Sequence, residues 1–479
     1  MDLHLELDAS LPLKSAVEEA IRAAIRTGRL RVPDPLPSTR ALAAQLGVAR
    51  GTVVEAYAQL AADGWLRTRR GAPARVARDA GQAPEPAAVQ PELSATEPVR
   101  WDLRPGVPDV SLFPGPSWAA AVREATRHGP DAYAYGDPRG RLELRSALTG
   151  YLSRTRGVAG TPGQTLVTGG FADGLALVAG ALRALGVRDI AMEDPCLPVH
   201  RQIVARAGLT VHPVPVDTRG LDVGALAATP ARAVLATPAH QFPLGVTLSP
   251  LRRRRLVEWA RRVDGYVIED DYDGEYRFDR RPVSALQALD PARVVYGGTT
   301  SKTLAPAMRL GWLVLPDRLC RPVVDRVVCQ QAPPLDQLAL AELIRGGRYD
   351  RQVRRTRGEY RRRRDRLIAA GLPLTGIAAG LHAVLSVRDE EELLTEARAA
   401  SVALFGLGPF WHEPDPSRPG PHPDPRTGPR RPQGVIVGYS RPPARTAPEA
   451  LDRLIAVTAR AGLRPGIQPP RCAARALPE

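Results

Sequence analysis

One lysine lies in a segment whose residue types suit covalent chemistry. The segment GGTTSKTLAPAMRLGW spans residues 297–312 and contains Lys302. The chain has 66 lysine and arginine residues, but only Lys14 and Lys302 are lysines and the other 64 are arginines. An ammonium group can lose its proton when desolvated, whereas a guanidinium stays charged, and only an amine forms a Schiff base. We therefore expect Lys302 to be a nucleophile; an ordinary surface lysine is the alternative.

The segment GYVIEDDYDGEY, residues 265–276, contains possible partners for this amine. A pyridoxal phosphate site requires a lysine, an acid facing the ring nitrogen, a donor to the ring hydroxyl and a phosphate cradle. Asp270 and Tyr272 follow an apolar strand-like run, and open α/β sheets bind ligands at that end of their strands. We expect Asp270 to hold the proton of the ring nitrogen and Tyr272 to donate to the phenolic oxygen.

Candidate phosphate ligands lie in two segments. Hydroxyl and guanidinium groups near Lys302 can bind phosphate, and they belong to Thr299, Ser301 and Arg309. The segment TGGFADGL, residues 168–175, reads as a strand, a glycine pair and a helix. Backbone N–H groups at a helix N-terminus bind phosphate. The groups concerned are those of Gly170, Phe171 and Ala172.

These motifs belong to a region in which strand-like runs alternate with helical stretches, from about residue 100 to 464. The runs are TLVTGG, DIAMEDP, LTVHPVPV, ARAVLATP, GYVIEDD, RVVYGGTT and RLGWLVLP. This alternation predicts an α/β domain with a mostly parallel sheet covered on both faces. One Pro/Arg-rich interruption, residues 413–433, is predicted to be a surface insertion.

Length, composition and charge limit the classes of protein to which the chain can belong. A chain of 479 residues is expected to form two or three domains. No apolar run approaches the length of a membrane helix, so no membrane partner is expected, and the start MDLHLELDAS does not resemble a secretory signal. The four cysteines have no metal-binding spacing, which predicts no metal site and suits a reducing cytoplasm. A net charge of +15 favours a polyanionic partner.

The positive charge is enriched near the N-terminus. Residues 10–78 contain 12 basic and 5 acidic residues, a net charge of +7. Residues 79–99 are rich in Ala, Pro and Glu and read as a linker. We therefore expect one domain over residues 1–78 and a second over 100–479. The second is expected to have a large subdomain of about 100–345 and a small one of about 346–464.

The first domain reads as a helix-turn-helix followed by a hairpin. A first helix over residues 13–27 is expected to bury Leu13, Val17, Ile21, Ala24 and Ile25. Ser38 is a good N-cap for a second helix, which ends at Gly47. A third helix from about residue 49 is expected to bury Val53, Tyr57 and Leu60.

The third helix and the hairpin carry candidate DNA contacts. In such motifs the first residues of the recognition helix meet the major groove, here Arg50, Gly51 and Thr52. Arg50 could bind a guanine edge. Arg40, in the second helix, and Arg70, in the hairpin before Gly71, are expected to contact DNA phosphates. A three-helix packing module with solvated arginines is the alternative.

The string LPSTRALAAQLGVARGTVVEAYAQLAADGWLRTRRGAPARVA resembles the winged helix of the GntR superfamily of bacterial regulators. This resemblance implies DNA contacts at Arg40, Arg50, Thr52 and Gly71. Two departures stand out: VPDPLPS replaces the usual PGDRLPS, and Gly51 replaces a polar residue of the recognition helix.

Residues 100–464 resemble the fold-type I aminotransferases, and more closely the MocR-type subgroup of GntR regulators. The segments that carry the resemblance are LRPGVPDVSLFP, YAYGDPRGRLELRSAL, TPAHQFPLG, IEDDYDGEYRF and GTTSKTLAPAMRLGW. It implies a winged helix-turn-helix followed by an α/β fold-type I domain in a cytoplasmic, head-to-tail homodimeric transcription regulator. That domain would bind pyridoxal phosphate and sense it or a small amino compound. His240 and Gln241 would line the cofactor pocket, and Tyr133 would reach the partner's phosphate.

Two positions depart from this pattern. Leu197, in EDPCLPVH, stands where relatives have a tyrosine that stacks on the cofactor ring, and loss of that aromatic face costs about 0.5–1.5 kcal/mol. The segment GVIVGYSRP has Val435, Ile436 and Val437 where transaminases place an arginine for the substrate carboxylate, and Arg441 is nearby.

Two alternatives to the regulator therefore stay open. One is a genuine aminotransferase with an appended regulatory winged helix. The other is a regulator whose sensor domain has lost the cofactor and binds a different small molecule.

Overall fold

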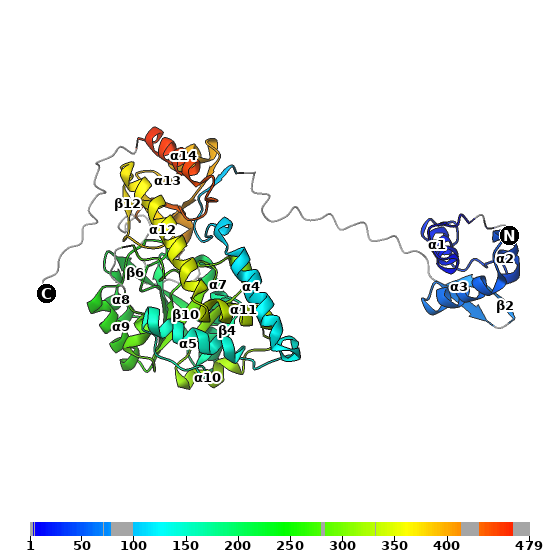
Figure 1. The fold of residues 1–479 in the computed structure, drawn as a ribbon, viewed down its shortest axis with the longest axis horizontal. Coiled ribbons are helices and arrows are strands. Elements are labelled where there is room, and N and C mark those ends of the chain that lie inside the picture. The colour runs from blue at the N-terminus through cyan, green and yellow to red at the C-terminus, as the bar shows by residue number, and fades with distance from the viewer. Residues whose placement is uncertain are drawn as a thin grey trace. The chain divides into compact units, whose positions relative to one another are not determined.

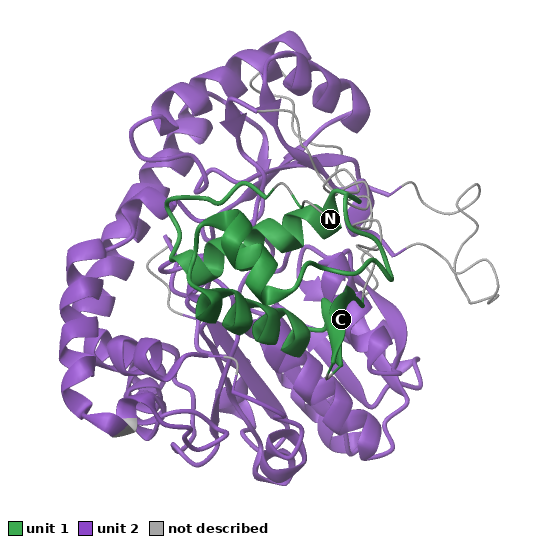
Figure 2. Ribbon diagram, turned by 90° about the vertical axis from the view of Figure 1, so that its right-hand side faces the viewer, with its two compact units in different colours: residues 1–97 green, residues 98–479 purple. Residues whose placement is uncertain are grey.

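The computed structural model describes residues 3, 5–69, 71–77, 99–278, 283–330, 332–412 and 431–462. The chain forms two compact units, Met1–Glu97 and Pro98–Glu479 (Figure 2). The expected linker lies almost wholly outside the described residues, as do Arg70 of the expected hairpin and most of the expected surface insertion. In the described ranges, no helix is both long enough and apolar enough to span a membrane.

The first unit is a three-helix bundle with a two-stranded hairpin (Figure 1). Its elements are α1 (Leu13–Arg26), α2 (Thr39–Leu46), α3 (Arg50–Ala62), β1 (Leu66–Arg69) and β2 (Ala72–Val76). Ser38 caps α2 by accepting from the Ala41 N–H at 3.1 Å, and Gly47 ends it in the left-handed region with φ 66°. Both caps agree with the expectation.

The apolar side chains of these helices form one core. Val17, Ile21, Leu42, Val53 and Leu60 have no exposed surface. The expectation for Leu13 was wrong, because its side chain is 50% exposed. Leu13 is the first residue of α1, and a first-turn side chain has no preceding turn of the helix to cover it.

The second unit contains an eight-stranded sheet of order β4-β11-β10-β9-β8-β5-β6-β7. All seven expected runs are strands. The strands are β4 (Thr165–Thr168), β5 (Asp189–Asp194), β6 (Thr210–Asp217), β7 (Gly220–Leu221), β8 (Ala233–Ala236), β9 (Tyr266–Asp270), β10 (Val294–Thr299) and β11 (Gly311–Val314). Neighbours pair in parallel from β10 through β9, β8 and β5 to β6, as expected.

Strand β11 is antiparallel to both neighbours, β10 and β4. Residues 300–310 separate β10 from β11, and a parallel return needs a crossover of a dozen or more residues. The chain therefore turns back within this short segment, which includes Lys302 and Arg309. The short β7 is likewise antiparallel to its neighbour β6.

Helices cover both faces of this sheet, as expected. Alternate strand residues enter different apolar clusters: Ile268 and Val295 pack with residues of α6, α7 and α10, whereas Val267 and Val294 pack with residues of α8 and α9. The helices of this part are α4 (Gly115–Ala125), α5 (Leu142–Arg156), α6 (Phe171–Ala184), α7 (Pro198–Arg206), α8 (Val223–Ala227), α9 (Pro250–Arg262), α10 (Asp317–Val324) and α11 (Pro334–Arg345).

The C-terminal part has its own antiparallel sheet of order β12-β13-β16-β15. Its elements are α12 (Arg348–Ala369), β12 (Leu374–Thr375), β13 (Ala383–Ser386), α13 (Glu390–Ala399), β14 (Val402–Ala403), β15 (Phe405–Gly406), β16 (Gly434–Val437) and α14 (Ala447–Arg460). Strand β3 (Trp101–Asp102) pairs in parallel with β14, and Trp101 and Leu103 share a core with β16. The unit's first residues therefore belong here, and not to the large subdomain in which we had expected them.

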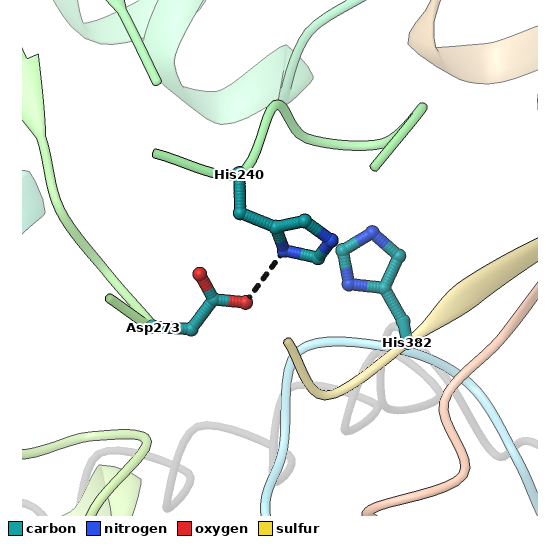
Figure 3. A group of neighbouring side chains, drawn as sticks. All are labelled: His240, Asp273 and His382. Atoms are coloured by element: carbon teal, nitrogen blue, oxygen red, sulfur yellow. Dashed lines mark hydrogen bonds and ion pairs between the residues drawn. The ribbon is translucent and has the colours of Figure 1, made fainter. Parts of the chain in front are cut away.

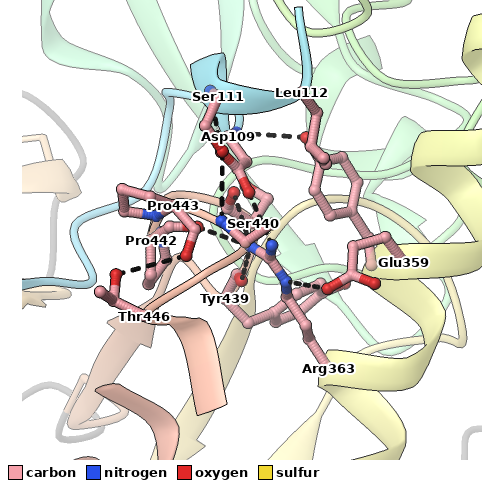
Figure 4. A network of polar contacts seen from close by, with 12 residues as sticks. Asp109, Ser111, Leu112, Glu359, Arg363, Tyr439, Ser440, Pro442, Pro443 and Thr446 are labelled. Atoms are coloured by element: carbon pink, nitrogen blue, oxygen red, sulfur yellow. Dashed lines mark hydrogen bonds and ion pairs between the residues drawn. The ribbon is translucent and has the colours of Figure 1, made fainter. Parts of the chain in front are cut away.

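A buried arginine ties this N-terminal segment to α12 (Figure 4). Arg363 forms an ion pair with Asp109 at 2.6 Å and donates to the carbonyl oxygen of Pro442 at 2.8 Å. Both charged side chains are buried, and removal of one partner from such a pair typically costs about 3–5 kcal/mol. The segment preceding α4 is thus held against α12.

Candidate cofactor site and DNA-contact residues

The carboxyl ends of β9 and β10 bring Lys302 close to Asp270. The two strands are parallel neighbours in which Asp270 lies opposite Gly297, and Lys302 is in the turn that follows β10. The Nζ of Lys302 donates to the carbonyl oxygen of Gly106 at 2.6 Å. Burial lowers the pKa of Lys302, although the nearby carboxylates of Asp270 and Asp273 act in the opposite direction. A lowered pKa increases the fraction of neutral, nucleophilic amine.

Asp270 is a buried carboxylate with an unsatisfied oxygen. Its side chain is almost wholly buried, and Oδ1 has no hydrogen-bond partner among the described residues. Oδ2 lies 3.9 Å from Nδ1 of His200. Burial raises the pKa of Asp270 well above its usual value, whereas the charge of Lys302 lowers it. A buried unpaired oxygen is costly, so this position fits a ligand that presents a protonated nitrogen, as the pyridine ring of pyridoxal phosphate does.

The candidate phosphate ligands gather at the N-terminus of α6. Gly170 precedes the helix with φ 110°, a conformation that favours glycine. A Cβ placed on Gly170 would lie 3.5 Å from Nη1 of Arg309, so the guanidinium is directly beside this backbone. The Oγ1 of Thr299 donates to Oγ of Ser301 at 2.9 Å on the neighbouring strand end. The expected phosphate ligands, with Phe171 and Ala172 as the first residues of α6, are thus assembled at these strand ends, and their contact with a cofactor stays a prediction.

Tyr272 contacts a group of buried polar side chains. Figure 3 draws three members of this group, namely His240, Asp273 and His382. The Nδ1 of His240 lies 2.8 Å from Oδ2 of Asp273 and 3.1 Å from the hydroxyl of Tyr272. A carboxylate can only accept, so Nδ1 of His240 carries the proton. That single proton goes to Asp273, at the shorter distance, so His240 holds Asp273 in place while its ring lies beside the Tyr272 hydroxyl.

His382, which directly precedes β13, is the third member of this group. Its Nε2 donates to the carbonyl oxygen of Pro243 at 3.1 Å, and burial lowers its pKa to about 3. Ligand atoms of His240, Asp273 and His382 lie within 4.8 Å of one another, as in a metal site. His240 and Asp273 already satisfy each other by a hydrogen bond, so we interpret the group as a support for Tyr272.

Sequence reasoning missed His200, Asp273 and His382. His200 lies on the first turn of α7, and its ring centroid is 5.3 Å from that of Phe171. Burial and the charge of Lys302 lower its pKa to about 4, so the ring is neutral at physiological pH. His200 is three residues after Leu197, and residues at this spacing share a helix face. This spacing could have indicated that His200 lies near the cofactor site. His382 is more than 100 residues from His240 and had no comparable signal.

Leu197 belongs to an apolar cluster between the two sheets. It packs with Phe242 and Leu244 against residues of the C-terminal part, namely Val384, Leu407, Phe410 and Ile436. Ile436 thus lies in apolar surroundings at the strand where transaminases place an arginine. Arg441 is engaged elsewhere, in an ion pair with Asp102 at 2.8 Å.

Two other expected cofactor residues have specific placements. Gln241 is buried, and its Nε2 donates to the carbonyl oxygens of Pro195 at 2.8 Å and Phe242 at 2.7 Å, so it holds the local backbone. Tyr133 ends the short 3-10 helix Pro130–Tyr133 and is 66% exposed in the single chain. Such exposure is what a residue directed at a partner subunit requires, and that role stays a prediction.

The expected DNA-contact residues that the structure describes lie at the surface of the first unit. Arg40 is exposed on α2, Arg50 is the exposed first residue of α3, and Thr52, two residues further along α3, is half-buried. Within the described part of the chain, neither Arg40 nor Arg50 forms an ion pair. Gly71 is exposed in the hairpin turn with φ 80°. The geometry leaves these arginines free to contact phosphates or bases.

Comparisons with known proteins agree with both units. Residues 13–76 match the family of bacterial regulatory proteins, gntR family, and residues 106–407 match aminotransferase class I and II. A pyridoxine biosynthesis transcriptional regulator, PdxR, of Corynebacterium glutamicum is 34% identical over 86% of this chain and 92% of its own length. A probable rhizopine catabolism regulatory protein, MocR, of Rhizobium meliloti is 33% identical over 94% and 95%.

Solved structures resemble the second unit. A multiple substrate aminotransferase from Thermococcus profundus matches with a TM-score of 0.65 and 22% identity, covering 77% of this chain and 93% of that one. An archaeal alanine:glyoxylate aminotransferase matches with a TM-score of 0.65 and 22% identity, covering 75% and 91%. At this identity the likeness establishes the aminotransferase fold.

Proposed function

The chain belongs to the GntR family of bacterial regulatory proteins, as a transcription regulator of the MocR/PdxR type with an aminotransferase class I and II domain, and we propose that Lys302 binds pyridoxal phosphate. The second unit then senses pyridoxal phosphate or a small amino compound, and the first unit binds double-stranded DNA. The relative from Corynebacterium is named for pyridoxine biosynthesis, which supports pyridoxal phosphate itself as a candidate effector.

The observation that carries this proposal is the unpartnered oxygen of Asp270 beside Lys302. Pyridoxal phosphate would supply an aldehyde for the amine and a ring that withdraws electrons. Asp270 would hold a proton at the ring nitrogen, and Tyr272 would donate to the phenolic oxygen. Arg309 and the N-terminus of α6 would bind the phosphate. The residues present fit the aldehyde, the ring nitrogen, the phenolic oxygen and the phosphate of this group.

The DNA-binding unit completes the proposed mechanism. The first residues of α3 would enter the major groove, with Arg50 at a base edge and Arg40 at phosphate. The chain would act as a homodimer, with Tyr133 of one subunit at the partner's phosphate, in the cytoplasm where the operator is accessible. These assignments rest on exposure of the arginines and on family membership.

A genuine aminotransferase with an appended winged helix is the second candidate function, and the fold supports it. The cluster around Ile436 disfavours it, because an apolar position there lacks the bidentate carboxylate clamp that orients an amino-acid substrate. We therefore propose that the chain is not an enzyme in the cell. Sustained exchange of amino groups between an amino acid and a keto acid would reverse this conclusion.

Loss of the cofactor is the other alternative, suggested by Leu197. The ring of His200, close to Phe171 and Asp270, offers a flat neutral surface in the same neighbourhood. This ring can replace part of the contact that a tyrosine would make, so Leu197 does not argue against pyridoxal phosphate.

The two lysines of the chain allow a matched test. Purified protein with pyridoxal phosphate should show a visible absorption band, and borohydride should attach the cofactor covalently. Lys302→Ala should abolish both signals, whereas Lys14→Ala should retain them. A band that survives Lys302→Ala, or label mapped to another residue, would contradict the assignment. DNA selected from random sequence should be bound by the wild-type protein and by Lys14→Ala.

A further inference from the structure

The net positive charge of the chain is concentrated in two places. Of a total of +15, residues 10–78 contribute +7 from 12 basic and 5 acidic residues. Helix α12 contains ten arginines and three acidic residues, which is another +7 within 22 residues. The rest of the chain therefore has a net charge of only +1, although arginine is abundant throughout. Abundance of arginine alone does not produce this distribution, because elsewhere acidic residues balance it.

The two faces of α12 use their arginines differently. The inner face is buried, and its Arg363 forms an ion pair with Asp109. The outer face exposes a stripe of five arginines, namely Arg351, Arg354, Arg355, Arg361 and Arg362. Beyond the stripe, the exposed Arg366 pairs with Asp452 at 2.6 Å. Spacings of three, four and seven residues place side chains on one side of a helix. At about 1.5 Å per residue, this stripe is roughly 16 Å long from its first to its last arginine. Figure 1 shows α12 on the viewer's side of the second unit.

Few acidic groups neutralise this stripe. Arg361 pairs with Asp365 at 3.6 Å, and Arg362 pairs with Glu359. Arg354 forms neither a hydrogen bond nor an ion pair with any residue that the structure describes. Exposed pairs of this kind are weak and do not prevent an arginine from engaging another anion. Of the five arginines, Arg351, Arg354 and Arg355 form no ion pair within the described fold, so the stripe keeps an excess of positive charge.

We propose that the exposed stripe of α12 is a second DNA-contact surface, which binds the phosphate backbone of operator or flanking DNA. This inference rests on the proposed DNA binding by the first unit. Duplex DNA presents about one negative charge per 1.7 Å of its axis, and the guanidinium fork matches phosphate. Contacts of this kind position a protein on DNA and carry no sequence information, so the first unit alone determines which sequence is read.

Helix α9 provides a matched control. It contains six arginines and one glutamate, and Arg254, Arg255 and Arg262 are exposed and form no ion pair within the described ranges. Its other arginines are engaged, for example Arg252 with Asp217 and Arg261 with Asp290. Replacing three exposed arginines on α9 changes the total charge as much as replacing three on α12. The comparison therefore separates a specific surface from a general effect of net charge.

The test compares two full-length triple variants on a long duplex that contains a selected operator and its flanks. One combines Arg351→Gln, Arg354→Gln and Arg361→Gln on α12, and the other combines Arg254→Gln, Arg255→Gln and Arg262→Gln on α9. If three phosphate contacts are lost, the slope of log K against log salt should fall by about 2.7 in magnitude. The α12 variant should therefore bind at least about tenfold more weakly at 0.1 M salt, with the preference for operator over scrambled DNA unchanged. The α9 variant should bind like the wild type.

Three outcomes would overturn the inference. Equal losses of DNA affinity in both variants would indicate an effect of net charge alone. Unchanged DNA affinity of the α12 variant would show that the stripe does not contact DNA and would favour another partner, such as an acidic protein. A changed operator preference in the α12 variant would place α12 at the bases. In each of these cases the proposed DNA binding stands if Arg50→Ala still loses operator affinity, whereas failure of the wild-type protein to bind any selected DNA would reject both. Circular dichroism should show that the two variants are equally folded.

Discussion

At the scale of single residues, Asp270 has a buried oxygen without a hydrogen-bond partner among the described residues, and a ligand with a protonated nitrogen would satisfy it. A buried carboxylate with an unpartnered oxygen destabilises the fold on its own. Asp270→Asn should therefore leave the melting temperature without cofactor unchanged or higher. The same change should weaken pyridoxal phosphate binding by about tenfold or more, because the amide cannot offer a charge to the ring nitrogen. Thermal melting and cofactor titration measure the two effects.

The opposite signs of these effects are the essential part of that prediction. Asp271→Asn is the control, because Asp271 pairs with buried Arg156 at 2.7 Å and serves the fold. Its loss should lower the melting temperature with or without cofactor. If Asp270→Asn behaved like this control, a structural role for Asp270 would be the better explanation.

Lys302 determines how cofactor capture depends on pH. Burial lowers its pKa below the usual lysine value of 10.5, and only the neutral amine attacks an aldehyde. The rate of cofactor capture should therefore fall as pH decreases through this lowered pKa, with a midpoint below that of a free lysine side chain. Stopped-flow absorbance over a range of pH measures it, with N-acetyl-lysine as the reference. A midpoint at or above the reference would show that Lys302 is not desolvated in solution.

At the scale of elements, α3 is positioned so that its first turn can read DNA. The buried side chains of Val53, Tyr57 and Leu60 fix the helix, and the Tyr57 hydroxyl donates to the carbonyl oxygen of Pro37 at 2.9 Å. Arg50 therefore projects from a rigid support. Arg50→Ala should cost about 1–3 kcal/mol of operator affinity and relax specificity at one base pair if it reads a guanine.

Arg26→Ala is a suitable control for that measurement. Arg26 is also an exposed arginine of the first unit, at the end of α1, and it pairs with Glu19. Its removal should change operator affinity much less than removal of Arg50. Fluorescence anisotropy with operator and scrambled duplexes gives both affinity and specificity. Equal, sequence-independent losses would assign Arg50 to phosphate instead of a base.

At the scale of the whole molecule, one segment connects the cofactor site to the start of the second unit. Gly106 accepts from Lys302, and Asp109 is held by Arg363. We expect pyridoxal phosphate, which engages the same Nζ of Lys302, to change this contact. Cofactor should therefore alter DNA affinity by the typical coupling of about 1–3 kcal/mol. Titrations of operator with and without pyridoxal phosphate measure this coupling.

Reciprocity provides the check on that prediction. Operator DNA must change the affinity for pyridoxal phosphate by the same factor. Lys302→Ala should remove the coupling while DNA binding itself persists. If both affinities were independent, the two units would be merely tethered, and the aminotransferase with an appended winged helix would become the preferred function.

Many of the secondary-structure elements and the candidate cofactor ligands can be predicted from short stretches of sequence. All seven expected strands are present, and the sequence also predicts Lys302, Asp270 and Arg309 as cofactor ligands. Both are possible because local patterns of apolar residues and the residue types that the cofactor requires are readable along the chain. The helices of the first unit could also be predicted from the sequence, since the caps of α2, Ser38 and Gly47, act on neighbouring residues. Both depend on interactions between residues close in sequence.

Only the tertiary structure decided how distant segments meet. The antiparallel direction of β11, the assignment of residues 101–103 to the C-terminal part, and the support of Tyr272 by His240, Asp273 and His382 all depend on contacts across long stretches of chain. The apolar surroundings of Ile436 likewise come from side chains of separate segments. Such contacts depend on packing and on burial of polar groups, whose free energies are set by three-dimensional neighbours and not by local sequence.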